Sequence, residues 1–411
     1  MKHFFYVALC VLCLGAFQAC GGDSDDVVNP NPGEPDIPVL PDLPAHDPNE
    51  VVEIKDPAFN KYLIEHYDRN NDSQLSYAEA DLILNLELSR YDQPVSMIRS
   101  LEGISNLRNL KELTIAFDID EVDLHDCRSL TSLDCYDARV LKINFSRCIS
   151  LTSLYSKENS WGESLASLNF SDCVALKELK CPMNRLTNLN LSGCSQLKIL
   201  NCRENQLTNL NLSGCSQLMG LRCSYNQLQS LDLSCCSQLT ELDCRSNQLL
   251  SLDLSCCSQL TYLDCAYNQL PSLDLSGCSQ LTELRCFSNQ LPSLDLSGCS
   301  QLTDLNCECN QLTSLDLSGC SALTDLDCSE NQLPSLDLSG CSQLTYLDCR
   351  NNKLTSLDIS KNTKMNRLNI QMNGLLETLY VWKGFSWENL YDSYKDDNTQ
   401  IIENSKIIIF P

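Results

Sequence analysis

A 21-residue repeat governs most of this 411-residue chain. Asparagines recur every 21 residues from Asn184 to Asn373, and each unit reads L-x-x-L-x-C-x-x-N-x-L followed by x-x-L-D-L-S-x-C-x-x. Thirteen units begin between Leu110 and Met365. Leucines that alternate with polar residues favour a short strand, and one such strand cannot bury its apolar face alone. The repeat therefore predicts a mainly β solenoid of about 13 turns, in which parallel strands stack and the leucines form one core.

Two columns of cysteine run along the predicted solenoid and hold 21 of the 27 cysteines. Stacked cysteines in one column have parallel Cα–Cβ vectors, which suit disulfide geometry poorly. Metal centres need close spacings such as C-x2-C, whereas these columns alternate at spacings of 8 and 13 residues. We therefore favour buried thiols that fill a narrow coil where leucine would overpack, with disulfides and metal ligands as the alternatives. Cys235, Cys256 and Cys309 lie outside both columns and should be the most exposed. One column is Cys135, Cys181, Cys202, Cys223, Cys244, Cys265, Cys286, Cys307, Cys328 and Cys349, and the other is Cys127, Cys148, Cys173, Cys194, Cys215, Cys236, Cys257, Cys278, Cys299, Cys320 and Cys341.

Two further columns are polar. The asparagine column is expected to be structural, because a buried amide at a turn can bond the backbone of its own coil and of its neighbour. An aspartate column runs from Asp232 to Asp358 at the same spacing. Stacked like charges repel one another, so these carboxylates are either compensated by backbone N–H groups and solvent or attract cations.

The nested pattern resembles the leucine-rich repeats called IRREKO and the cysteine-containing repeats of internalin-type surface proteins. The resemblance covers roughly residues 100–375. It implies a right-handed leucine-rich-repeat coil and a role in adhesion or host interaction. We place the solenoid at residues 101–375, a small helical N-terminal cap at 51–100, and a C-terminal cap at 376–411. The last segment is rich in aromatic residues and should cover the exposed edge of the final coil.

The N-terminus predicts export and anchoring. Residues 1–19 hold a short apolar run after Lys2 and are expected to be a signal peptide. The segment GAFQAC resembles the lipobox of bacterial lipoproteins, which implies lipidation at Cys20. The following GGDSDD resembles an acidic export signal of Gram-negative lipoproteins. Residues 20–50 are proline-rich and should form an extended linker. We therefore expect a protein anchored by lipid to the outer membrane and facing the cell exterior.

One stretch before the repeats carries metal-ligand chemistry. DRNNDSQLSYAE resembles the EF-hand calcium loop, also used in dockerin-like modules, and YAEADLILNLEL (residues 77–88) suits the exit helix. Ser73 replaces the usual glycine at the sharp turn, which should weaken binding. The alternative is a helix–turn–helix cap without metal. The calcium ligands implied by the resemblance are Asp68, Asn70, Asp72, the carbonyl oxygen of Gln74, Ser76 and Glu79.

The chain's charge and histidine content narrow its function. A formal charge of −25 argues against nucleic acid and anionic lipid, both of which require a basic patch. The four histidines lie outside the regular coils, so the repeats contain no imidazole for a Ser-His-Asp catalytic triad or a Cys-His catalytic dyad. We expect neither an enzyme nor an organic cofactor, and contact with the membrane only through the lipid anchor.

The repeats vary at exposed positions that flank the first strand. Rigid aromatic residues beside arginine are common anchors of recognition surfaces, which favours a binding face here. The alternative is drift, with aromatic side chains that merely support the sheet. We therefore expect a monomeric surface lipoprotein whose solenoid binds an extracellular protein or a glycan, with a scaffold or accessory subunit of an outer-membrane complex as the alternative. The candidate ligand-binding residues are Tyr225, Arg245, Tyr262, Tyr267, Arg285, Phe287 and Tyr346.

Overall fold

The computed structural model describes residues 40–43, 45–92, 95–136, 138–157, 164–396, 398–403 and 406–408. All of them lie in one compact unit, Ile37–Pro411. The expected signal peptide, Cys20 and residues 21–39 of the expected linker lie outside the described residues. None of the helices in the described ranges is both long enough and apolar enough to cross a membrane.

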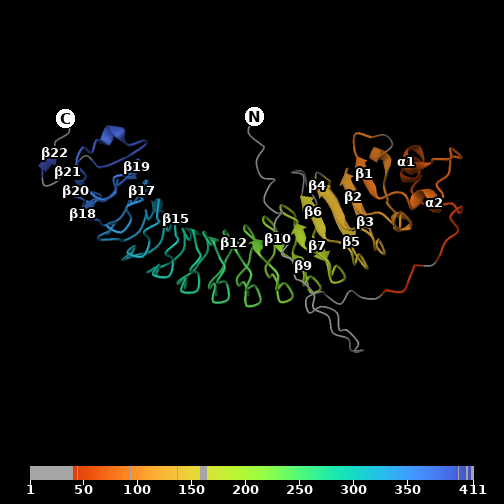
Figure 1. Ribbon diagram of the computed structural model, residues 1–411, viewed down its shortest axis with the longest axis horizontal. Helices are drawn as coiled ribbons and strands as arrows, with labels where there is room; N and C mark the ends of the chain where they lie inside the picture. The colour runs from red at the N-terminus through yellow and green to blue at the C-terminus, as the bar shows by residue number, and fades with distance from the viewer. Residues whose placement is uncertain are drawn as a thin grey trace, which may run out of the picture. The chain divides into compact units, whose positions relative to one another are not determined.

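A parallel sheet of 14 strands lines one side of the solenoid (Figure 1). Each strand pairs in register with its neighbour, so that Leu242 faces Leu263 and Leu263 faces Leu284. Thirteen of the strands belong to the thirteen predicted coils, which confirms the solenoid and its number of turns. In sheet order the strands are β1 (Asn85–Ser89), β2 (Glu112–Ala116), β4 (Ser132–Tyr136), β6 (Ser153–Lys157), β8 (Glu178–Lys180), β10 (Ile199–Asn201), β11 (Gly220–Arg222), β12 (Glu241–Asp243), β13 (Tyr262–Asp264), β14 (Glu283–Arg285), β15 (Asp304–Asn306), β16 (Asp325–Asp327), β17 (Tyr346–Asp348) and β19 (Arg367–Asn369).

The remaining strand, β1, corrects the expected exit helix over residues 77–88. Helix α2 (Tyr77–Ala80) is a single turn, and the chain then extends into the sheet. Leu86 and Leu88 are buried while Glu87 between them is exposed, which is the period of a strand. These two leucines pair with Leu113 and Ile115 of β2, so burial against the first coil outweighs local helix propensity.

The second half of each coil is extended and forms small sheets only towards the two ends of the solenoid. Near the N-terminal end, β3 (Ile119–Asp123) pairs with β5 (Val140–Asn144), and β7 (Ser167–Asn169) pairs with β9 (Asn188–Asn190). At the C-terminal end the order is β18 (Ser356–Asp358), β20 (Thr378–Val381), β21 (Gln400–Glu403) and β22 (Lys406–Ile408).

Short helices and irregular segments close the two ends. At the start, α1 (Pro57–Tyr67) buries Phe59 and Leu63. It is capped by Asp56, whose carboxylate accepts the backbone N–H groups of Ala58 and Phe59. The 3-10 turns η1 (Val95–Met97) and η2 (Ile104–Asn106) follow. At the other end, after η3 (Trp387–Asn389), the backbone N–H of Tyr394 bonds Leu368 of β19, and that of Tyr391 bonds Asn366 just before this strand. The aromatic-rich segment thus lies along the edge of the last strand of the long sheet.

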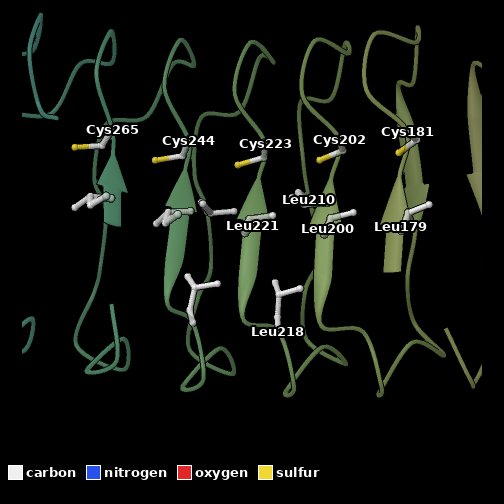
Figure 2. Close-up of a cluster of buried hydrophobic side chains, with 14 of the residues drawn as sticks. Leu179, Cys181, Leu200, Cys202, Leu210, Leu218, Leu221, Cys223, Cys244 and Cys265 are labelled. Atoms are coloured by element: carbon white, nitrogen blue, oxygen red, sulfur yellow. The ribbon is translucent and has the colours of Figure 1, made fainter. Parts of the chain in front are cut away.

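The column cysteines are packing residues. Figure 2 shows five of them in a row, with their thiols pointing to the same side beside the leucines. Apart from Cys127, which is 6% exposed, every column cysteine is fully buried, and all are free thiols. Burial raises the pKa of Cys202 to about 12. Cys256 is exposed and Cys235 and Cys309 are half-buried, which confirms the predicted exceptions.

The asparagine column joins neighbouring coils. In Asn226 the amide nitrogen donates to the carbonyl oxygens of Cys223 in the same coil and Cys202 in the preceding one, both at 3.0 Å. The residue before each of these asparagines has a positive φ, as Ser246 does at 52°.

In the aspartate column, Asp232 accepts the Ser234 N–H at 2.9 Å, and this bond lowers the pKa of the carboxyl. The side chains of both columns therefore form hydrogen bonds with backbone groups, as expected for the asparagines and as one of the two alternatives for the aspartates.

Candidate functional site

The solvent-facing side of the long sheet is here called the strand face. It consists of the first and third residues of β8, of β10 to β17 and of β19, which flank a buried leucine on each strand. The strands are in register, so equivalent positions of successive coils stand in rows across the sheet. A second feature, here called the turn row, consists of the two residues after the strand cysteine in each coil. The seven candidate ligand-binding residues are divided between the strand face and the turn row.

The turn row holds four of the candidates in two close pairs. Tyr225 lies under the guanidinium of Arg245, with 5.4 Å from the guanidinium carbon to the ring centroid. Tyr267 meets the edge of Phe287 with 5.0 Å between ring centroids. Arg245 also contacts the buried carboxylate of Asp264 at 3.4 Å. Both pairs join residues 20 positions apart, so each pair bridges two adjacent coils.

The other three candidates lie on the strand face. Burial, and after it the charge of Asp264, raises the pKa of Tyr262 to about 12. Arg285 forms an ion pair with Glu283 of the same strand at 2.7 Å. Tyr346 lies four coils after Tyr262 and is covered by Arg367, whose guanidinium carbon is 5.2 Å from the ring centroid. The structure therefore does not gather the seven residues into one site.

A shallow hollow of about 530 Å³ lies on the strand face over β14 to β17 and β19. Arg285 and Tyr346 line it, together with residues that the sequence analysis did not select. The sequence carried a signal for them, because the first-position residues share the variable strand position of Tyr262 and Tyr346, and the third-position residues share that of Arg285. These additional lining residues include Asp304, Asp325 and Arg367 at the first strand position and Asn306 and Asp327 at the third.

One mixed cluster could in principle hold a metal ion. Glu308, Cys309 and Glu330 bring their ligand atoms within 4.8 Å of one another. However, the Cys309 thiol already donates to Glu330 at 3.0 Å, and the guanidinium of Arg350 bonds Glu308 at 2.8 Å. An arginine that neutralises the same carboxylates disfavours a cation there, so this cluster is best described as an ion-pair network.

In the loop expected to bind calcium, the carboxylates accept hydrogen bonds from backbone N–H groups of the same loop. Asp68 accepts the N–H groups of Asn71 and Ser73 at 2.7 and 2.8 Å, and those two residues adopt positive φ values of 60° and 65°. Glu79 accepts the N–H of Arg69 and both the N–H and the hydroxyl of Ser76. Burial alone would raise the pKa of Glu79, but these bonds outweigh it and lower the pKa to about 2.

The other expected ligands lie in the same loop. Asn70 accepts the N–H of Asp72, and Asp72 accepts the N–H of Gln74. The oxygens of Asp68, Asp72 and Glu79 are not among the groups of described side chains that converge within 4.8 Å. A calcium ion would therefore have to draw these carboxylates together.

No protein-family model and no curated protein matches the chain. The fold is similar to the functional domain of InlJ from Listeria monocytogenes, which includes a cysteine ladder, with a TM-score of 0.63 and 27% identity over 82% of this chain and 80% of that chain. It is also similar to the internalin InlF from Listeria monocytogenes, with a TM-score of 0.55 and 18% identity over 85% and 95% of the two chains. The likeness to InlF concerns the fold alone. The chain is thus a leucine-rich-repeat solenoid whose structural neighbours are internalin-like proteins.

Proposed function

We propose that this chain is a surface-anchored protein whose solenoid binds a macromolecule outside the cell, through the strand face and the turn row. The preferred partner is a protein, and a glycan is the second choice. The role is that of a binding protein of the adhesin type and not of an enzyme. The likeness to the functional domain of InlJ supports this proposal at the level of fold.

One observation carries the proposal. Tyr225 and Tyr267 are 46% and 54% exposed, although both adopt left-handed backbone with φ of 55° and 51°. That conformation costs an L-residue about 1 kcal/mol. Ser246 and Ser288 occupy the same position of neighbouring coils, so the fold does not require an aromatic ring there. Exposed aromatic rings at strained positions that the core does not need are well explained by recognition.

The first experiment screens the purified full chain against arrays of extracellular proteins and glycans. A variant that combines Tyr225→Ala, Tyr267→Ala and Phe287→Ala should lose the binding seen with the original chain. Leu250→Ala is the matched control, because Leu250 is also apolar and exposed but lies outside both the strand face and the turn row. Binding that survives the triple variant would contradict the proposed site. Co-purification with envelope proteins, without any array ligand, would favour the scaffold alternative.

We propose further that Cys20 carries the lipid anchor. The basis is the sequence GAFQAC followed by an acidic run and a proline-rich linker. Cells expressing the full chain and fed a radiolabelled fatty acid should label it and retain it in the outer membrane. A Cys20→Ser variant should be unlabelled and found in the soluble fraction. Equal labelling of the two chains would refute the proposal.

Calcium binding by residues 68–79 is also proposed. The loop fits calcium in ligand type, since it offers three carboxylates, an amide oxygen, a hydroxyl and a backbone carbonyl. Because Glu79 would have to exchange hydrogen bonds for the ion, we expect weak affinity. Isothermal titration of the full chain should show heat at millimolar calcium, and Glu79→Gln should abolish it. No heat from the original chain would refute this proposal and leave the binding face unaffected.

A further inference from the structure

Cysteine replaces the glycine of the repeat in two successive coils. Cys235 directly precedes the column residue Cys236, and Cys256 occupies the position of Cys235 one coil later. The flanking coils have Gly214 and Gly277 there. A Cβ added at Gly277 would lie 3.7 Å or more from every atom beyond its chain neighbours. The fold therefore tolerates a side chain at this position but does not require a thiol.

The thiols of Cys235 and Cys236 have the separation of two ligands on one metal ion. Their sulfur atoms lie 3.7 Å apart. Two thiolates that bind one ion at about 2.3 Å with a tetrahedral angle between them lie about 3.8 Å from each other. The observed side-chain positions therefore fit a chelate of two adjacent cysteines.

The repeat places Cys256 beside this pair. Side chains at this position lean towards the preceding coil, because the Cys235 thiol donates to the carbonyl oxygen of Leu212, 23 residues earlier, at 2.9 Å. The atom closest to a Cβ at Gly277 is likewise in the preceding coil, the carbonyl oxygen of Ser255. By the same geometry, the side chain of Cys256 stands over the turn that holds Cys235.

The three thiols form a path from solvent into the coil. Cys256 is exposed, Cys235 is half-buried and Cys236 is buried. Their sulfur atoms are not among the groups of described side chains that converge within 4.8 Å. Cys256 would therefore have to rotate about its χ1 angle to join the other two, and an exposed side chain has other staggered rotamers available.

The donor set selects the class of ion. Thiolates are soft ligands that prefer soft ions such as Cu(I), whereas Ca²⁺ and Mg²⁺ prefer oxygen ligands. A structural zinc site needs four ligands. Within the described residues, no carboxylate or imidazole converges with these thiols to supply a fourth. Three thiolates without further ligands suit a monovalent soft ion of low coordination number.

We propose that Cys235, Cys236 and Cys256 bind a soft monovalent cation of the Cu(I) class through three thiolates. Each thiol would release its proton to solvent when the ion binds, and no electron is transferred. The inference goes beyond the proposed binding function, because these residues lie in the second halves of their coils, outside the strand face and the turn row.

The first test is protection from N-ethylmaleimide in the full chain, reduced and free of oxygen. The probe is Cu(I) alone, supplied as its acetonitrile complex at one equivalent. Copper should slow the labelling of Cys256 and Cys235 at least tenfold and leave that of Cys309 unchanged, as located by mass spectrometry. Cys309 is the internal control because it is also half-buried and lies outside both cysteine columns. Equal protection of Cys309 would mean unspecific capture by thiols and would overturn the inference.

The second test restores the residue of the repeat in Cys235→Gly and, separately, in Cys256→Gly. Both variants should fold, because neighbouring coils have glycine at this position, and circular dichroism with urea midpoints verifies this. Cys309→Ser is the matched control, since it removes one accessible thiol and Ser288 holds the same position one coil earlier.

Competition with the chromogenic chelator bathocuproine disulfonate measures the affinity of each chain for Cu(I). Both glycine variants should bind at least about tenfold more weakly, and Cys309→Ser should change less than twofold. Unchanged affinity in either glycine variant, or an equal loss in Cys309→Ser, would contradict the three-thiolate site. Binding of an array ligand should be the same in both glycine variants as in the original chain, so the metal site and the proposed function stand or fail separately.

Discussion

The side-chain oxygen of Asn226 accepts the backbone N–H of Leu207 at 3.0 Å, although 19 residues separate the two. The amide nitrogen of the same side chain donates to carbonyl oxygens in two coils. One asparagine therefore closes its own turn and ties its coil to the preceding one. The same pair of contacts recurs from Asn205 to Asn373.

We expect Asn226→Ala to lower the free energy of unfolding by about 3 kcal/mol, because buried backbone groups of two coils lose their partners. Asn211→Ala is the control, since Asn211 accepts only the N–H of Ser213 at an exposed turn, and it should cost about 1 kcal/mol or less. Urea unfolding followed by circular dichroism measures both values. Similar losses in the two variants would contradict the structural role of the column.

Thiol labelling tests whether the columns are buried free cysteines. In the folded protein N-ethylmaleimide should modify Cys256 first, and Cys235 and Cys309 more slowly. Burial, and then the carboxylate of Glu330, raises the pKa of Cys309 to about 12, which suppresses the reactive thiolate. The column cysteines should react only in denaturant, and without any reductant. Mass spectrometry locates the labels, and column thiols that need a reductant would revive the disulfide alternative.

The buried thiols also predict loss of stability at alkaline pH. Burial raises the pKa of Cys194 and Cys202 to about 12, above the ordinary value of 9.0 that an unfolded chain has. This contribution to stability is complete below pH 9 and is lost as the pH rises towards 12, because only the unfolded chain releases the protons. The loss should be about 1.4 kcal/mol per pH unit for each buried thiol.

Urea midpoints between pH 7 and 11 measure this effect. A variant with Cys194→Ala and Cys202→Ala should lose stability less steeply above pH 9, by about two protons. The comparison cancels the tyrosines and lysines that titrate in the same range. Identical slopes for the two chains would contradict the assignment to the thiols.

The repeat pattern was sufficient to predict the fold because it fixes which residues face inward. The number of coils, the buried cysteines and the asparagine contacts all follow from alternation and spacing. It was not sufficient for β1, since the residues after Ala80 favour a helix locally and burial against β2 overrides that preference. Nor could it predict which residue of the C-terminal segment would bond the edge of β19, because that segment has left the repeat; the structure shows that Tyr394 does so.

The candidate site was only partly predictable for a related reason. The pairs Tyr225–Arg245 and Tyr267–Phe287 follow from a separation of 20 residues once the strands are in register. The hollow over β14 to β17 and β19 does not follow. The charges that surround Asp304 depend on where the neighbouring guanidinium groups point, and Arg367 is directed to Asp392, a residue outside the repeats.

The left-handed position before each asparagine allows a last prediction, which separates recognition from structural support. Ser246→Gly should stabilise the protein by about 0.5 kcal/mol, because the relief of strain exceeds the extra entropy of the unfolded chain. Tyr267→Gly gains the same relief but loses the ring contact with Phe287, worth about 1 kcal/mol. Its net effect should therefore be a small loss in the free energy of unfolding, of about 0.5 kcal/mol. If urea unfolding instead shows a loss of more than about 2 kcal/mol, the ring of Tyr267 supports the fold, and its exposure no longer argues for a binding face.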